Sequence, residues 1–144
     1  MNDMAKANVR DVKPDTKVVL ALAWTALLGL YIYCDIYSLF RPGILESMTA
    51  GKMGPFDVSQ AGLALAALLM ILPILAAPAS VLLPARAGRI LSLVLAPLYF
   101  LVNIGNLLGE SWIYYYLFGV LELALTAGIF LVALRWPTTR SRES

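Results

Sequence analysis

Histidine is absent from the sequence, and Cys34 is its single cysteine. Haem ligation by histidine, histidine-containing metal sites, and Ser-His or Cys-His catalysis are therefore excluded. Disulfide exchange needs a pair of cysteines, so one chain cannot supply the chemistry of a membrane thiol oxidoreductase. We predict no metal and no cofactor, and we expect Cys34 to be a small packing residue.

Charged residues are also scarce, at 14% of the chain against 60% hydrophobic residues. A soluble core cannot hide that much apolar surface. Four apolar stretches each approach the roughly 20 residues that a helix needs to cross a bilayer. They predict helices at about 17–40, 57–83, 89–109 and 111–135. We therefore expect an all-α, multi-pass membrane protein whose transmembrane domain, residues 17–137, is a four-helix bundle between polar tails at 1–16 and 138–144.

The positive charges predict the orientation of this bundle. Of the 11 lysines and arginines, all except Arg41 and Lys52 lie in the two tails or in the second loop. Positive residues concentrate on the cytoplasmic side of membrane proteins, so both termini are predicted in the cytoplasm and the protein in the cell (inner) membrane. No basic cluster is dense enough to indicate binding of nucleic acid.

The longest connection, residues 41–56, carries its own pattern. Ile44, Leu45 and Met48 form an amphipathic run between glycine-containing turns, which predicts a short interfacial helix in the first external loop. Asp57 followed by Gln60 resembles a capping box, and this places the start of the second helix at Asp57.

Prolines and a short link shape the remaining helices. Pro73, Pro78 and Pro97 lie inside apolar stretches, where each removes an intrahelical hydrogen bond and bends the helix. The link at residues 109–111 is so short that the third and fourth helices must be antiparallel neighbours.

Glu122 is the most informative residue, since it lies about halfway along the last apolar stretch. An ionisable group at that depth costs about 2.5 to 3.5 kcal/mol on insertion scales. No lysine or arginine lies at the same depth, so Glu122 is either protonated or faces water and a ligand. The alternative is a neutral Glu122 that is hydrogen bonded to Asn103 for stability alone.

Other polar side chains gather in the non-cytoplasmic half of the helices. Tyr31 shares a helical face with Asp35, and Tyr115 lies two turns from Glu122. We predict a pocket that opens outward, with carboxyl groups at its bottom and an aromatic rim of Tyr31, Tyr114 and Tyr115. The predicted ligand-binding residues are Tyr31, Asp35, Asn103, Asn106, Glu110, Tyr115 and Glu122.

These polar residues also have a purely structural interpretation. Asp35 and Glu110 lie near the headgroup region, where they can be solvated, and the tyrosines fit an interfacial aromatic belt. Asn103 and Asn106 can hydrogen bond across helices without any ligand.

Several linked motifs carry a resemblance to a known family. They are Asp35-Ile36-Tyr37-Ser38-Leu39-Phe40, Gly54-Pro55-Phe56-x-Val58-Ser59-Gln60, Gly109-Glu110-x-Trp112-x-Tyr114-Tyr115, Phe118-Gly119-x-x-Glu122 and Trp136-Pro137. Over about residues 17–137 the chain resembles an uncharacterised bacterial family of small four-helix membrane proteins, domain of unknown function 6326. The resemblance implies a fold and a topology but no activity. A looser similarity to DoxX-like membrane proteins is architectural only.

Three classes of function follow from these observations. The first, which we favour, is binding or transport of a small cationic or amphipathic solute, or of a lipid, at Glu122 and Asp35. The second is a structural or accessory subunit, whose polar groups fix the choice of a partner membrane protein or of a second copy of the chain. The third is a membrane enzyme acting on a lipid or isoprenoid, with Glu122 and Asp35 as acid and base; no catalytic residue is assigned.

Overall fold

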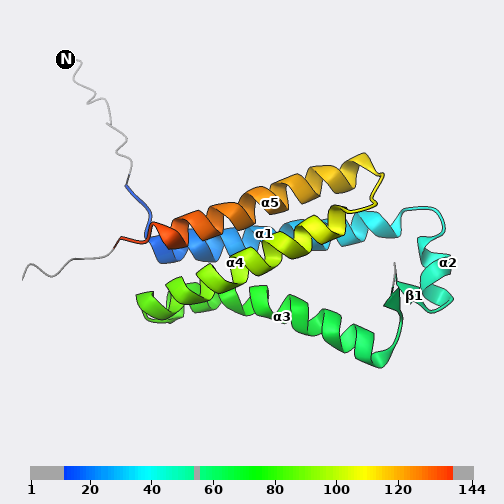
Figure 1. Cartoon of the computed structure of the whole chain (residues 1–144), viewed down its shortest axis with the longest axis horizontal. Coiled ribbons are helices and arrows are strands. Elements are labelled where there is room, and N and C mark those ends of the chain that lie inside the picture. The colour runs from blue at the N-terminus through cyan, green and yellow to red at the C-terminus, as the bar shows by residue number, and fades with distance from the viewer. Residues whose placement is uncertain (1–11, 54–55, 138–144) are drawn as a thin grey trace, which may run out of the picture.

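The computed structural model describes residues 12–53 and 56–137. Its long helices are α1 (Thr16–Leu39), α3 (Gln60–Leu82), α4 (Ala85–Leu107) and α5 (Ile113–Leu134). All four are long and apolar enough to cross a membrane. The predicted all-α transmembrane bundle is confirmed, and Figure 1 shows its helices running along one common direction.

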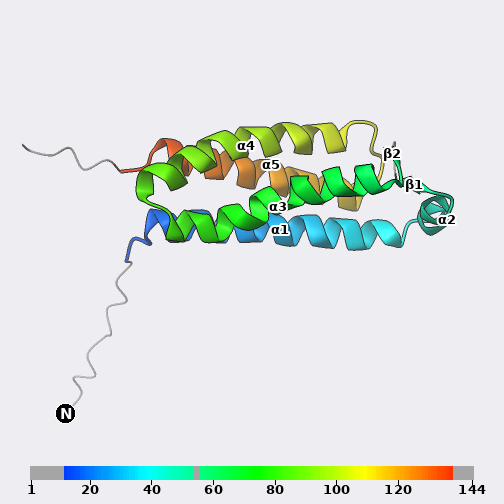
Figure 2. The same cartoon turned by 90° about the horizontal axis from the view of Figure 1, so that it is seen from below.

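The long helices form a ring in which each packs mainly against two neighbours. α1 packs against α3 and α5, and α4 packs against the same two helices from the opposite side. The expected antiparallel pairing of the last two helices, α4 and α5, is confirmed. The start of α1 and the end of α5 lie at one end of the bundle (Figures 1 and 2). We call this the terminal end, and the opposite end, which carries α2 and the hairpin, the loop end.

The loop end contains the short helix α2 (Ile44–Thr49) and the two-residue strands β1 (Lys52–Met53) and β2 (Phe56–Asp57). Gly43 before α2 and Gly51 after it have φ angles of 82° and 81°. Only glycine adopts that left-handed conformation without strain, so these two residues form the turns around the helix. The short helix predicted between two turns is therefore confirmed.

The capping box predicted at Asp57 is wrong. Asp57 lies in β2, and its carboxylate accepts a hydrogen bond from the ammonium group of Lys52 on β1. The N-cap of α3 is Ser59, whose hydroxyl accepts from the backbone N–H of Gly62 at 3.0 Å. The helix begins at Gln60, rather than at residue 57, because the hairpin occupies the residues before Ser59.

The predicted bounds of the next helices also shift. α4 begins at Ala85, directly after Pro84, and so includes Arg86 and Arg89, which were predicted to lie in or at the edge of a loop. A proline has no N–H group, and it is well tolerated where the first turn of a helix has no intrahelical acceptor to offer. α4 ends at Leu107 and α5 starts at Ile113, which makes their link longer than residues 109–111.

Two cations at the terminal end hold the carboxyl ends of neighbouring helices. The Lys17 ammonium donates to the carbonyl oxygens of Val81 and Leu83 at 3.1 and 2.7 Å. The Arg89 guanidinium donates to the carbonyl of Ala133 at 3.1 Å. The last carbonyls of a helix lack intrahelical donors, so these side chains cap α3 and α5.

The apolar core lies between all four long helices. Leu20, Trp24 and Leu27 of α1 are fully buried, and the ring of Trp24 meets that of Tyr99 of α4 edge to face at 6.1 Å. The indole N–H of Trp24 donates to the hydroxyl of Ser92 at 3.4 Å. The polar groups of this core are thus partly paired with one another.

Candidate functional site

A small cavity lies between the long helices in the half of the bundle nearer the loop end. Its volume is about 70 Å³, which is room for a few water molecules or one small polar group. We call it the polar pocket. It is lined by Tyr31, Cys34 and Asp35 of α1, Met70 of α3, Val102 and Asn106 of α4, and Tyr115 and Glu122 of α5.

Two carboxylates contribute to the polar pocket. Glu122 is only 5% exposed, whereas Asp35 is exposed, so Asp35 lies at the mouth and Glu122 lies deeper. The ion pairs among the described residues are Arg41–Glu110 and Lys52–Asp57, and neither involves these two carboxylates. Two carboxylates beside one small volume repel each other when both are ionised. A proton or a cation in the pocket relieves that repulsion.

A buried hydrogen bond lies beside the pocket. The Tyr31 hydroxyl donates to the side-chain carbonyl of Asn103 at 2.8 Å, and both residues are buried. Within the described residues the side-chain nitrogen of Asn103 has no hydrogen-bond partner. An unmade hydrogen bond of a buried donor costs about 1 to 3 kcal/mol. Asn103 is hydrogen bonded to Tyr31 and not to Glu122. The alternative in which a neutral Glu122 pairs with Asn103 for stability alone is thus not formed.

The sequence matches a family of unknown function, DUF6326, over residues 8–142. The chain belongs to this family. No curated protein and no solved structure matches the chain. Membership of DUF6326 agrees with the membrane fold and assigns no activity, so the function has to be argued from the geometry of the site.

In this DUF6326 protein the structure places three of the predicted ligand-binding residues, Asn103, Asn106 and Glu110, in different surroundings. Asn106 lines the polar pocket, Asn103 lies behind it, and Glu110 does not line it. Glu110 instead forms a bidentate ion pair with Arg41, with nitrogen–oxygen distances of 2.8 and 3.2 Å. The structure thus places Glu110 in a contact between the end of α1 and the α4–α5 link.

The Arg41–Glu110 contact is reinforced by its surroundings. One oxygen of Glu110 accepts from the backbone N–H groups of Ser111 and Trp112 at 2.7 and 3.1 Å. The Arg41 guanidinium lies 5.1 Å from the centre of the Trp112 ring, within the range of a cation–π contact. Burial opposes ionisation of Glu110, but Arg41 and the two amides outweigh it and lower the pKa of Glu110 below its usual value.

The aromatic rim is smaller than predicted. Tyr31 and Tyr115 line the polar pocket, but Tyr114 does not, because its hydroxyl forms a hydrogen bond of 2.9 Å with Ser38. Sequence reasoning missed Cys34, Met70 and Val102 as lining residues. Cys34 and Val102 could have been found from helical spacing, since each lies next to or one turn from a predicted residue.

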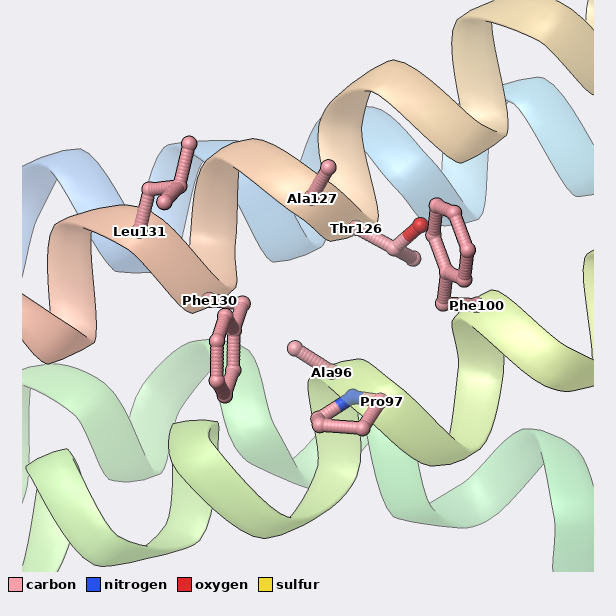
Figure 3. Close-up of a pocket in the computed structure, with 7 residues that line it drawn as sticks. All are labelled: Ala96, Pro97, Phe100, Thr126, Ala127, Phe130 and Leu131. Carbon is pink, nitrogen blue, oxygen red and sulfur yellow. The ribbon is translucent and has the colours of Figure 1, made fainter.

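A larger cavity lies between α4 and α5, but it contains no ionisable side chain. Its volume is about 320 Å³, and it is lined by Ala96, Pro97, Phe100, Thr126, Ala127, Phe130 and Leu131. Figure 3 shows Phe100 pointing from α4 towards α5 and Phe130 pointing from α5 towards α4. The Thr126 hydroxyl donates to carbonyl groups of its own helix, at Glu122 and Leu123. This cavity therefore offers apolar surface and no free polar group for recognition.

Proposed function

We propose that this DUF6326 protein binds a small cationic group in the polar pocket and carries it across the membrane. Glu122 is the carboxylate that pairs with the cation, and Asp35 attracts it at the mouth. The observation that carries the proposal is the buried carboxylate of Glu122, which lines a cavity of about 70 Å³ with a second carboxylate and no lysine or arginine.

The chemistry of the lining supports a cation rather than an anion. Two carboxylates give the pocket a negative potential when either is ionised, and an ammonium group can donate hydrogen bonds to both. Tyr115 supplies an aromatic surface beside them, which also favours a cation.

The depth of Glu122 supports transport in addition to binding. A carboxylate in the middle of a transmembrane helix can hold a proton when the pocket is empty and release it when a cation takes its place. This exchange would couple movement of the cation to movement of a proton. The distribution of positive charges supports an outward position of the loop end, and hence of the pocket mouth, with the termini in the cytoplasm of a cell whose inner membrane holds the protein.

A structural subunit is the second candidate function. Residues 60–72 of α3 contain no buried side chain, and a helix of a partner membrane protein, or of a second copy, would cover them. An enzyme would need both carboxylates near one substrate, and Asp35 and Glu122 do line the same pocket.

The test compares two glutamine substitutions. In lipid nanodiscs the parent protein is expected to bind dodecylammonium, and Glu122→Gln to weaken that binding by at least about tenfold, because the ion pair is lost. Glu46→Gln, on the exposed face of α2, is the matched control and should bind like the parent. Isothermal titration calorimetry measures each affinity, with empty nanodiscs as the blank.

The hypothesis of a structural subunit predicts a different result. Failure of Glu122→Gln to accumulate, or a much lower melting temperature in a protein whose parent binds no cation at any pH, would favour the accessory subunit. A partner protein would then be sought instead of a ligand.

A further inference from the structure

The two halves of α3 differ in how they pack. Pro73, Ala76, Ala77 and Ser80 are buried, whereas residues 60–72 contain no buried side chain. Figure 1 shows α3 diverging from the other long helices towards the loop end. Since few buried contacts mean low local stability, residues 60–72 can separate from the bundle at smaller cost than the rest of the helix.

The two halves meet at a proline hinge. Pro73 has no N–H group, so the carbonyl of Leu69, four residues earlier, loses its partner within the helix. The hydroxyl of Tyr99, on α4, donates to this carbonyl instead. Tyr99 is fully buried and also packs against Trp24. At this proline the helix is therefore tied to α4 by a side-chain hydrogen bond.

The polar pocket lies directly behind this hinge. Met70, the residue after Leu69, is the contribution of α3 to the lining. Asp35 of α1 and Asn106 of α4 also line the pocket, and both are exposed. Because α3 packs between α1 and α4, a movement of residues 60–72 away from the bundle opens the pocket towards the bilayer.

The same segment carries an apolar groove on its surface. Its volume is about 400 Å³, and it is lined by Leu65, Leu68, Leu69 and Leu72. Leu69 thus lies in the groove while its neighbour Met70 lies in the polar pocket. Adjacent residues of one helix thus line an acidic pocket of head-group size and an apolar groove several times larger.

We propose that residues 60–72 form a lateral gate, through which the pocket takes an amphipathic cation from the bilayer. The ammonium head pairs with Glu122, and the hydrocarbon tail lies along the leucine groove. This proposal rests on the proposed function, because Glu122 binds the head group. It adds the class of solute and the route by which that solute arrives.

Rates of association test the gate. Dodecylammonium carries both head and tail, methylammonium only the head, and dodecanol only the tail. Stopped-flow tryptophan fluorescence in nanodiscs should show that dodecylammonium associates faster than methylammonium and that dodecanol does not bind the pocket. Tyr99→Phe removes the hydrogen bond that holds the gate and should raise the association rate of dodecylammonium about fivefold, the factor that one net hydrogen bond represents.

Pro73→Ala acts in the opposite direction. Alanine restores an N–H group that can donate to Leu69, so the helix straightens and the association rate should fall. Pro78→Ala is the matched control, since it removes a proline of the same helix beyond the hinge, and its rate should equal that of the parent. Hydrogen exchange should rise in residues 60–72, and not in the rest of α3, when Tyr99 is replaced by phenylalanine. If Tyr99→Phe does not fold, Pro73→Ala decides the question alone.

The outcomes separate the gate from the binding site. Equal rates for methylammonium and dodecylammonium, unchanged by Tyr99→Phe and Pro73→Ala, would overturn the gate while Glu122-dependent binding upheld the proposed function. An equal fall in Pro78→Ala would assign the effect to helix stiffness and overturn the hinge. Binding of dodecylammonium that survives Glu122→Gln would overturn both proposals.

Discussion

Glu110 is the residue through which the stability of the loop end depends on pH. Arg41 and two backbone amides hold its pKa below the ordinary value of 4.5. A carboxylate whose pKa is lower in the folded state than in the unfolded state stabilises the fold at pH values above its unfolded-state pKa. That stabilisation is lost as the pH falls through its folded-state pKa. We expect the melting temperature to drop as the pH falls below about 4.5, with a contribution of about 1 kcal/mol from the pair.

Glu110→Gln should lower the melting temperature at neutral pH and flatten its decline in acid. The control is Asp57→Asn, which breaks the Lys52–Asp57 pair, whose side chains are 60% and 76% exposed. Exposed pairs contribute little, so this variant should melt like the parent. Thermal melting in detergent between neutral and acidic pH measures both, and an unaltered acid profile in Glu110→Gln would show that the decline belongs to other carboxylates.

The residues of the candidate site could be predicted from the sequence to different degrees. Glu122 and Asp35 could be found because a carboxylate in an apolar stretch is conspicuous, and Tyr31 and Tyr115 because they share a helical face with one of them. Glu110 has the same helical spacing from Asn103 as Tyr115 has from Glu122, but Arg41 pairs with Glu110 across 69 residues of sequence. Spacing along one helix cannot show such a contact, and for the same reason it could not show that Met70 faces the pocket.

Among the elements, the α4–α5 pair depends on a glycine. A Cβ atom at Gly119 would lie 2.5 and 3.1 Å from the two terminal carbons of Leu107 and 3.0 Å from its Cγ. The whole end of the Leu107 side chain would have to move, and overpacking of this kind costs about 1 to 3 kcal/mol. We expect Gly119→Ala to lower the melting temperature of the protein.

Gly128→Ala provides the comparison on the same helix. No atom lies within 4 Å of a Cβ atom built there, and alanine is favoured over glycine in helices by about 0.5 to 1 kcal/mol. Gly128→Ala should therefore melt at or above the temperature of the parent. Equal effects of the two substitutions would show that helix propensity, and not the contact with Leu107, determines the result.

The elements themselves were predictable where the membrane imposes them. Hydrocarbon demands about 20 apolar residues per helix, and this requirement alone locates α1, α3, α4 and α5. The starts were less predictable, because Asp57 and Ser59 are both good N-cap residues. The pairing of β1 with β2 decides between them, and that pairing is a tertiary contact which composition does not reveal.

For the whole molecule, the remaining question is which end faces the cytoplasm. Lys17 and Arg89 cap helices at the terminal end, and Arg86 and Arg135 belong to that end as well. Positive residues resist translocation across the membrane, so this end is expected to stay in the cytoplasm. A background without reactive thiols, Cys34→Ser, allows a single cysteine to be placed at either end without altering these charges.

Ala50→Cys at the loop end and Ala85→Cys at the terminal end are a matched pair, since both alanines are exposed. In intact cells a membrane-impermeant maleimide should label Ala50→Cys, and it should label Ala85→Cys only after permeabilisation. The reverse pattern would place the mouth of the polar pocket on the cytoplasmic side and turn the proposed direction of uptake around. Labelling of both from one side would contradict the crossing of the membrane by α3, because α3 connects the two ends, and its 23 residues span the hydrocarbon once at about 1.5 Å per residue.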